Sequence, residues 1–339
     1  MRAVGYQQPG AIDRDDALSD IELPEPPLQK EHDILVEVRA VSVNPLDIKV
    51  RSSIAARAGG WKVLGWDASG IVRAVGANVS RFKPGDEVFY AGALNRPGSN
   101  SERHLVDERI VGRKPASLDW AGAAAAPLTA ITAWEMLFDR LGVNSPVPGA
   151  ARAILILGAA GGVGSIAVQL ARRLTDLTVI GTASRPETAE WVRGLGAHHV
   201  LDHGQPLAAQ AAALGLGAPG HVFSITHSGE HLAEVAELIA PQGRYGLIDE
   251  PASLDAKIFK TKSVSLHWES MFTRPIFRTA DIAAQGALLD EVSKLIDEGV
   301  LRTTLTEQFS PINAANLRRA HAVIESQRTR GKIALEGWG

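Results

Sequence analysis

The most regular hydrophobic pattern in the chain is a short apolar run, followed by a glycine-rich turn and an amphipathic stretch. Residues 154–157 are four consecutive large aliphatics, which predicts a strand buried on both faces. From Val163 to Arg173 apolar residues recur at intervals of three and four, which predicts a helix with one face against a sheet. Strand, glycine turn and helix in this order predict an α/β unit.

The same alternation continues along the chain. We expect strands at 177–182, 198–201, 220–225, 243–248 and 263–268, and helices at 186–194, 206–214 and 230–239. Strands that alternate with helices in this way form a doubly wound parallel sheet. The fold class predicted for this part of the chain is therefore α/β.

The flanking segments have a different pattern. Short β-rich runs at 34–43, 71–76 and 87–90 are separated by Gly/Pro turns, which predicts a small barrel or sandwich. Residues 121–139 are helical in composition, and Pro127 divides them into two helices. After residue 275 a helix at 282–298, the segment 301–309, a helix at 314–326 and the segment 332–335 break the alternation. We expect this tail to return to the first domain, which gives a β-rich domain of residues 1–130 and 275–339 and a nucleotide-binding domain of residues 131–274.

The composition of the chain excludes several classes of function. The 339 residues are 45% hydrophobic and 22% charged, as in globular proteins, and the net charge of −3 gives no support for a nucleic-acid partner. There is no cysteine, which excludes disulfides, a thiol nucleophile and thiolate metal ligands. No signal-like run begins the sequence and no stretch is expected to approach a membrane span, so the predicted location is cytoplasmic, with no membrane partner.

The glycine turn predicts a dinucleotide site. Small residues let the backbone approach a pyrophosphate, and free N–H groups at the helix start attract the anion. The spacing departs from G-x-G-x-x-G because Ala159 and Ala160 follow the first glycine, and no Gly-Lys-Ser/Thr follows to make a P-loop. The candidate cofactor-binding residues here are Gly158, Ala160, Gly161, Gly162, Val163 and Gly164.

The end of the second strand favours NADPH over NADH. An NAD site usually has an acid at this point, but the chain has Ser184 and Arg185, with no acid before Glu187. An Arg fork suits a 2′-phosphate, and a hydrogen bond to a charged group contributes about 1.5–3 kcal/mol, or roughly a ten- to hundredfold preference. The alternative is that Arg185 only begins a solvated helix. His203 and Thr226 are further candidate cofactor residues.

Five motifs together resemble those of the medium-chain dehydrogenase/reductase superfamily: residues 43–47, 64–70, 83–88 and 128–134, and the glycine turn. Within it the chain is similar to the zinc-free quinone oxidoreductase branch and the zinc-type alcohol dehydrogenase-like subgroup. The resemblance implies a GroES-like catalytic domain beside a Rossmann domain. It also implies that Thr129 and Lys332 contact the cofactor, and that two copies form a homodimer through the strand at 263–268.

The resemblance raises the question of zinc. Zinc-dependent relatives hold the catalytic metal at three positions that match Asn44, Trp66 and Leu128 in this sequence. A zinc site needs N, S or carboxylate ligands, and these side chains supply none, so we predict no active-site metal. The histidines at 198, 199, 203, 227 and 231 are the remaining candidate ligands, and for them we expect roles other than metal binding.

Without a metal the developing charge on a hydride acceptor is only weakly stabilised, which suits acceptors that are already activated. Asn44 is the predicted polar group near the nicotinamide. Asp47 and Asp67 are further catalytic candidates, but we expect them to organise loops rather than transfer protons. The predicted function is an NADPH-dependent oxidoreductase that reduces a small quinone or α,β-unsaturated carbonyl. The alternatives are an alcohol dehydrogenase or carbonyl reductase, and a low-turnover NADPH-binding sensor or structural protein.

Overall fold

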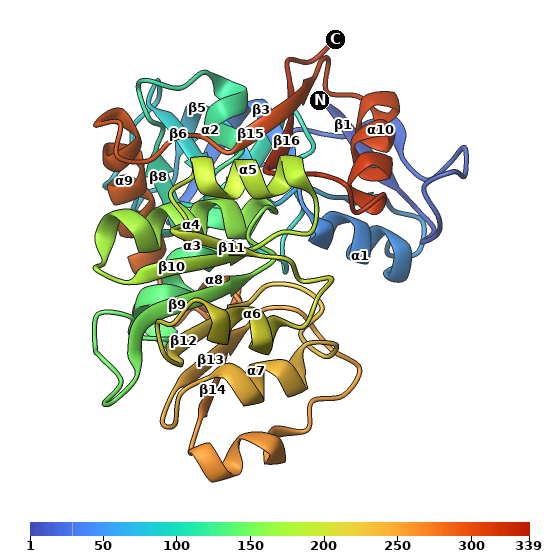
Figure 1. The fold of residues 1–339 in the computed structure, drawn as a ribbon. Coiled ribbons are helices and arrows are strands. Elements are labelled where there is room, and N and C mark those ends of the chain that lie inside the picture. The colour runs from blue at the N-terminus through green and yellow to red at the C-terminus, as the bar shows by residue number, and fades with distance from the viewer. Residues whose placement is uncertain (29) are drawn as a thin grey trace. The chain divides into compact units, whose positions relative to one another are not determined.

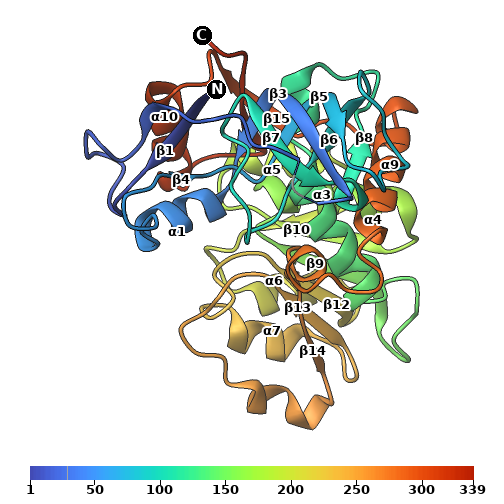
Figure 2. The ribbon, with the colours of Figure 1, turned by 180° about the vertical axis from the view of Figure 1, so that it is seen from behind.

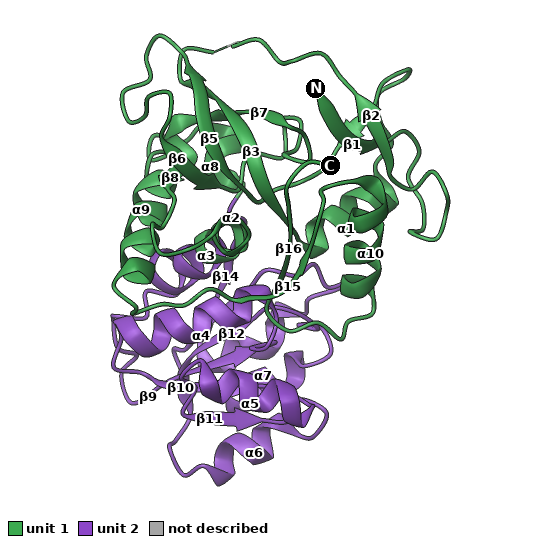
Figure 3. Ribbon diagram, turned by 90° about the horizontal axis from the view of Figure 1, so that it is seen from above, with its two compact units in different colours: residues 1–131, 272–339 green, residues 132–271 purple. Residues whose placement is uncertain are grey.

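The structure, a computed structural model, describes residues 1–28 and 30–339 and divides into two compact units. Unit 1 comprises Met1–Ile131 with Phe272–Gly339, and unit 2 is the continuous segment Thr132–Met271 (Figure 3). The two segments of unit 1 therefore meet in space although 140 residues of unit 2 separate them in sequence.

Unit 2 is a six-stranded sheet in which every neighbouring pair is parallel. The strand order is β11-β10-β9-β12-β13-β14, so the order reverses between β9 and β12 (Figures 1 and 2). This is the doubly wound arrangement that the sequence predicts. The strands are β9 (Ala151–Leu157), β10 (Thr178–Thr182), β11 (His199–Leu201), β12 (Pro219–Ser224), β13 (Arg244–Leu247) and β14 (Ser265–Trp268).

Helices cover both faces of this sheet, which is why β9 is apolar on both sides. Leu155 and Leu157 share a core with the helices α6 and α7, while α4 packs on β9 and β10 with Ile166 and Leu170 buried. The helices are α4 (Gly162–Leu174), α5 (Pro186–Gly194), α6 (Leu207–Ala213) and α7 (Leu232–Leu238), followed by the 3-10 helix η3 (Ala256–Lys262).

Unit 1 is built on a largely antiparallel seven-stranded sheet with the order β15-β16-β3-β5-β6-β8, and with β7 paired to β3. Its strands are β3 (Asp33–Val43), β5 (Ala68–Val75), β6 (Glu87–Tyr90), β7 (Arg103–Asp107), β8 (Val111–Arg113), β15 (Leu305–Phe309) and β16 (Lys332–Glu336). A smaller sheet contains β1 (Arg2–Tyr6), β2 (Ser19–Glu22) and β4 (Lys62–Val63). Its helices are α1 (Pro45–Ser53), η1 (Glu108–Ile110), α2 (Trp120–Ala124), α8 (Thr273–Phe277), α9 (Ala284–Asp297) and α10 (Ala314–Glu325).

The pairing of β16 with β3 brings the end of the chain to its beginning. Ile333 lies opposite Val43 and Ala334 opposite Ser42, which confirms that the tail returns to the β-rich part. Asn44 follows β3 directly and Lys332 begins β16, so this register places the two residues side by side.

The helical region after residue 119 is more divided than the sequence predicts. Pro127 begins α3 (Pro127–Trp134) as expected, but residues Glu135–Arg140 form a π-helical turn, η2, in which the Leu141 N–H bonds to the Met136 carbonyl. Proline suits a first helical position because its missing N–H has no partner there.

One helical run has the length and composition of a membrane span, contrary to the expectation from the sequence. The helical run Trp120–Arg140 is long and apolar enough to cross a bilayer, but 83% of its apolar 18-residue window is buried within the protein, as in a core helix. A cytoplasmic location stays a prediction.

Candidate functional site

The glycine turn lies at the carboxyl end of β9, where the strand order of unit 2 reverses. Ligands of open α/β sheets bind at such a point. Gly158 has a φ of 77°, in the left-handed region that favours glycine. A Cβ on Gly164 would lie 2.3 Å from the Gly158 carbonyl oxygen, so the start of α4 packs on the turn too closely for any side chain.

Gly161 differs from its neighbours in what surrounds it. It is the N-cap of α4 with a φ of −72°, and a Cβ there would meet nothing closer than 3.6 Å. The protein's own packing therefore does not demand glycine at this position. Because the first N–H groups of a helix lack partners within the helix, the open space beside Gly161 at the start of α4 is a cradle that fits a pyrophosphate.

Three polar side chains gather round this cradle from the neighbouring strands. Thr182, the last residue of β10, accepts a hydrogen bond from the Gly158 N–H at 3.1 Å, and His203 Nδ1 lies 3.3 Å from the same hydroxyl. The Thr226 methyl would lie 3.1 Å from a Cβ on Gly158. Two predicted residues, His203 and Thr226, thus lie beside the turn, and Thr182 was missed although it ends a predicted strand.

Burial lowers the pKa of His203, and the neighbouring His231 and His227 lower it further. A neutral His203 can donate or accept a hydrogen bond but adds no charge for a phosphate. The His203 and His231 rings are 6.5 Å apart, and His231 Nδ1 pairs with Glu234 at 3.0 Å. Among residues 1–28 and 30–339, no group of three or more His, Cys, Asp or Glu side chains is arranged to hold a metal.

Ser184 and Arg185 follow β10 at the surface of unit 2. Arg185 is the N-cap of α5, one third of its side chain is exposed, and its Nε lies 3.3 Å from Glu187 Oε1. An exposed ion pair of this kind contributes about 0–1 kcal/mol, less than the roughly 1.5–3 kcal/mol of a hydrogen bond to a charged group. The contact with Glu187 is therefore weaker than the hydrogen bond that a phosphate would make to the guanidinium.

A second polar cluster is buried in unit 1, where β3, β5 and β16 meet. The Lys332 ammonium donates to Asp67 Oδ2 at 2.8 Å, to Asn44 Oδ1 at 2.5 Å and to the Val43 carbonyl at 3.2 Å. Asp67 also accepts from Asn44 Nδ2 at 2.9 Å and from the Leu128 N–H at 2.7 Å. Burial raises the pKa of Asp67, and the ammonium and these donors oppose that shift.

Asp47 supports the cluster from α1. Its two carboxylate oxygens accept from the Asn44 N–H at 2.8 Å and the Gly65 N–H at 2.9 Å. Burial raises the pKa of Asp47 to about 7, against the effect of these donors and of Lys332. Gly65 has a φ of 108°, and a Cβ there would lie 2.6 Å from Asn100 Oδ1, so glycine is required where Asp47 binds.

The four predicted residues Asn44, Asp47, Asp67 and Lys332 are thus brought together, but their functional groups face one another. All three ammonium hydrogens of Lys332 have acceptors within the cluster. No ammonium hydrogen is therefore left for the direct contact with a cofactor that the resemblance implies. The Thr129 hydroxyl, in α3, donates to the Ala126 carbonyl at 3.0 Å. One Asn44 amide hydrogen has no acceptor among the described residues.

These residues do not fit a zinc ion. The positions that resemble zinc-ligand positions do gather, since the Asn44 side chain and the Leu128 N–H both bind Asp67, next to Trp66 in sequence. Zinc needs three N, S or carboxylate ligands. The described residues of the cluster offer the carboxylates of Asp67 and Asp47, and Asp47 already accepts from two backbone N–H groups. The Lys332 ammonium, rather than a metal, supplies the positive charge beside it.

Comparisons with known families and structures agree on the class of protein. Residues 30–134 match the family described as alcohol dehydrogenase GroES-like domain, and residues 195–335 match zinc-binding dehydrogenase. A zinc-type alcohol dehydrogenase-like protein of Staphylococcus aureus is 38% identical over 99% of both chains.

Two solved structures have the same fold. A Rhizobium etli protein, described as a zinc-dependent alcohol dehydrogenase, has a TM-score of 0.98 and 66% identity over 100% of this chain and 98% of its own. The Escherichia coli quinone oxidoreductase, solved with NADPH, has a TM-score of 0.81 and 23% identity over 99% and 100%. The latter likeness concerns the fold alone.

Proposed function

This chain belongs to the medium-chain dehydrogenase/reductase superfamily, and from that premise we propose that it is an NADPH-dependent oxidoreductase that reduces a quinone or α,β-unsaturated carbonyl without a metal. One observation carries the proposal: Asn44, at a position that resembles a zinc-ligand position of the family, is bonded to a lysine and an aspartate instead. A site with this donor set suits acceptors that need little activation.

The residues of unit 2 support the choice of coenzyme. The N–H groups at the start of α4 would hold the pyrophosphate beside Gly161, and Ser184 and Arg185 would hold the 2′-phosphate. Thr182 fixes the turn through the Gly158 N–H. When bound, NADPH supplies the hydride, and the protein contributes binding, orientation and the exclusion of competing reactions.

Asn44 is the proposed donor to the acceptor oxygen. Its amide has one orientation, because turning it over would face its NH2 group to the Lys332 ammonium and its oxygen to the Asp67 carboxylate. Lys332 and Asp67 are therefore positioning residues. One remaining neutral N–H gives limited stabilisation of a developing oxyanion. That is sufficient for an enolate or hydroquinone anion, which is much less basic than an alkoxide.

The test is a comparison of acceptors with metal-free protein. We expect faster NADPH oxidation with 1,4-quinones and enones than with simple aldehydes and ketones, unchanged by 1,10-phenanthroline, with less than 0.1 zinc per chain by elemental analysis. One tightly held zinc per chain, together with a preference for simple alcohols and aldehydes, would establish the alcohol dehydrogenase alternative.

A homodimer is part of the proposal. β14 is an end strand of the six-stranded sheet, and Trp268 at its end is 53% exposed. An end strand presents unpaired N–H and C=O groups, which a second β14 could satisfy across a two-fold axis. Sedimentation velocity should give twice the mass of one chain, and a monomer at micromolar concentration would exclude this pairing.

A further inference from the structure

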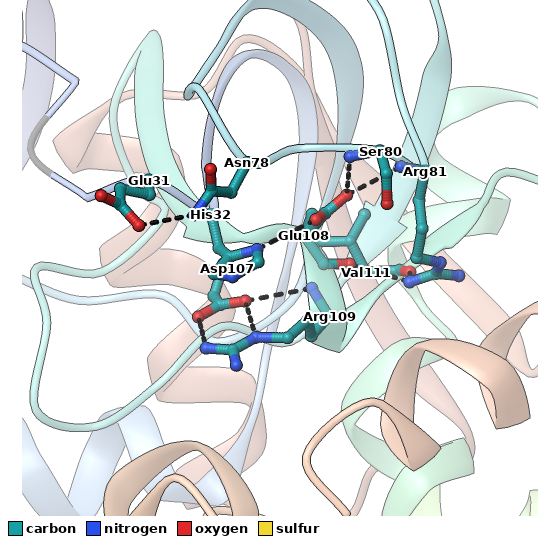
Figure 4. A network of polar contacts seen from close by, with 9 residues as sticks. All are labelled: Glu31, His32, Asn78, Ser80, Arg81, Asp107, Glu108, Arg109 and Val111. Carbon is teal, nitrogen blue, oxygen red and sulfur yellow. Dashed lines mark hydrogen bonds and ion pairs between the residues drawn. The ribbon is translucent and has the colours of Figure 1, made fainter.

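A solvent-facing hollow in unit 1 lies apart from both clusters described above. Its volume is about 460 Å³, within the usual range of small-molecule sites. The pairing of β3 with β7, which places Asp33 opposite Asp107, brings residues 30–32 alongside residues 107–109 (Figure 4). The lining residues are Lys30, Glu31, His32, Asp107, Arg109 and Arg278.

The acidic groups of the hollow are already paired. Asp107 accepts from Arg109 Nη2 at 2.7 Å and Nε at 2.9 Å, and Glu31 accepts from Asn78 Nδ2 at 2.5 Å. Burial would raise the pKa of Asp107, but the hydrogen bonds from Arg109 outweigh it and hold the pKa below its usual value. The Arg109 guanidinium therefore compensates the charge of Asp107, whereas Glu31 is held by a neutral amide.

A buried carboxylate holds the wall of the hollow in place. Glu108 is 2% exposed and accepts from the backbone N–H groups of Ser80 and Arg81 at 3.0 and 2.8 Å (Figure 4). Its other oxygen lies 3.1 Å from His32 Nδ1. The contact with Glu108 fixes the orientation of the His32 ring. The other ring nitrogen, Nε2, has no hydrogen-bond partner among the described residues.

Two cations in the hollow have no such compensation. The side chains of Lys30 and Arg278 make no hydrogen bond or ion pair with any residue in 1–28 and 30–339. Arg278 ends α8 with a φ of 48°, a left-handed position where glycine is the usual residue and where another residue costs about 1–2 kcal/mol. An arginine is therefore placed at the hollow although the backbone there disfavours it.

We propose that this hollow binds a small molecule that carries a phosphate monoester. Lys30 and Arg278 together outweigh the Glu31 carboxylate in the lining. Both cations can contact the oxygens of one phosphate group, whereas a monocarboxylate would leave one of them unpaired. A guanidinium fork and an ammonium are the side chains that commonly hold phosphate. The net charge of −3 on the chain opposes this only weakly, because charges more than about 8 Å apart are screened at physiological ionic strength. The volume has room for the organic part of the ester.

The first test is calorimetric titration with β-glycerophosphate, and separately with inorganic phosphate, at constant ionic strength. We expect one site per chain in the wild type and in Arg185→Ala, and at least tenfold weaker binding in the double variant Lys30→Ala, Arg278→Ala. The control is Arg173→Ala, Lys257→Ala, which removes the same charges from exposed positions of unit 2 and should bind as the wild type does.

The outcomes separate this site from the coenzyme site. Equal binding by all four proteins, or no binding by the wild type, overturns the proposal. Loss of binding in Arg185→Ala alone also overturns it, since the phosphate would then occupy the coenzyme cradle. Tighter binding of the ester than of inorganic phosphate assigns the site to a phosphorylated metabolite, and equal affinity for the two contradicts the claim that the organic part is held.

A second measurement does not depend on variants. Phenylglyoxal modifies accessible arginines, and peptide mass spectrometry can follow Arg278 and Arg173 separately. Saturating β-glycerophosphate should slow the modification of Arg278 at least fivefold and leave Arg173 unaffected. Equal modification of Arg278 with and without the ester overturns the proposal.

Discussion

A single ammonium group holds the buried cluster of unit 1 together. Lys332 gives its three hydrogens to three oxygens, one of which belongs to an Asp67 carboxylate that is fully buried. Buried ion pairs add little to stability compared with apolar residues of the same shape, but removing one partner leaves an uncompensated charge. The cluster therefore matters for orientation and is sensitive to single substitutions.

Replacing Lys332 tests this sensitivity. Lys332→Met should lower the free energy of unfolding by about 3–5 kcal/mol, because Asp67 is left charged and buried. Adding Asp67→Asn should restore part of the loss, since the variant no longer buries an unpaired charge. Urea unfolding measures both, and Lys294→Met, at a side chain that is 61% exposed, is the control with little effect. A loss in the double variant as large as in the single one would contradict this account.

Arg185 decides the choice between coenzymes in the proposed function. Arg185→Ala should raise the KM for NADPH about ten- to hundredfold and leave that for NADH nearly unchanged, because a charge-assisted bond to the 2′-phosphate is lost. Steady-state kinetics with the best quinone acceptor measure both, with the exposed Arg173→Ala as the matched control. An equal rise in KM for NADH and NADPH would show that Arg185 does not bind the 2′-phosphate.

At the scale of elements, the β9–α4 turn separates two uses of glycine. Gly164 is required by the fold, because its Cβ would meet the Gly158 oxygen and the Ala159 backbone. Gly161 is not required by the described packing, and its backbone conformation suits any residue. The sequence motif treats the two glycines alike, and the three-dimensional packing distinguishes them.

This difference gives a paired prediction. Gly164→Ala should lower the free energy of unfolding by about 1–3 kcal/mol through overpacking. Gly161→Ala should leave it within about 0.5 kcal/mol of the wild type, but weaken NADPH binding at least tenfold, because its methyl would enter the phosphate cradle. Chemical denaturation and fluorescence titration measure the two effects. If Gly161→Ala binds NADPH normally, the pyrophosphate does not lie where we propose.

The π-helical turn η2 and the segment after β14 bury two glutamates together in unit 2. Arg140 Nε lies 2.7 Å from Glu269 Oε2. Burial raises the pKa of Glu269 to about 8, with the Glu135 charge as the next cause. A folded-state pKa above the unfolded value means that the folded protein holds the proton longer, so stability declines as the pH rises from about 4.5 to 8 and then levels off.

Removing the Glu135 charge, which contributes to the raised pKa of Glu269, should flatten this decline. In Glu135→Gln the pKa of Glu269 falls, and the loss of unfolding free energy between pH 5 and 8 should shrink by about 1.4 kcal/mol for each unit of that fall. Urea denaturation across this range measures it, and Glu291→Gln, at a half-exposed side chain, should keep the wild-type profile. An unchanged slope in Glu135→Gln would mean that the Glu135 side chain does not raise the pKa of Glu269.

At the scale of the whole molecule, the two units differ in continuity. Unit 2 is one segment, whereas unit 1 needs residues from both ends of the chain because β16 pairs with β3. We expect a fragment of residues 127–271, which keeps α3 whole, to unfold cooperatively on its own. Residues 1–131 alone should not, and should recover a folded signal when co-expressed with residues 272–339. Circular dichroism during urea titration tests both, and a cooperative transition in residues 1–131 alone would contradict the role given to β16.

Most of the fold could be predicted from the chain, because strands and helices with strong periodicity depend on residues near in sequence. The run at 154–157, the glycine turn and the helix after it are all where the pattern predicts them, and the motifs identify the superfamily. The π-turn at Glu135–Arg140 and short elements such as α8 were not predicted, because a single turn has too few residues to show a period.

What only the tertiary structure decided is how the predicted site residues are used. The amino-acid sequence by itself singles out Asn44, Asp67 and Lys332, but it does not show that Lys332, 265 residues from Asp67, gives its hydrogens to the cluster. That contact depends on the register of β16 against β3, which is set by packing between segments at opposite ends of the chain. Local patterns carry no information about that register, so the roles of these side chains follow from the fold.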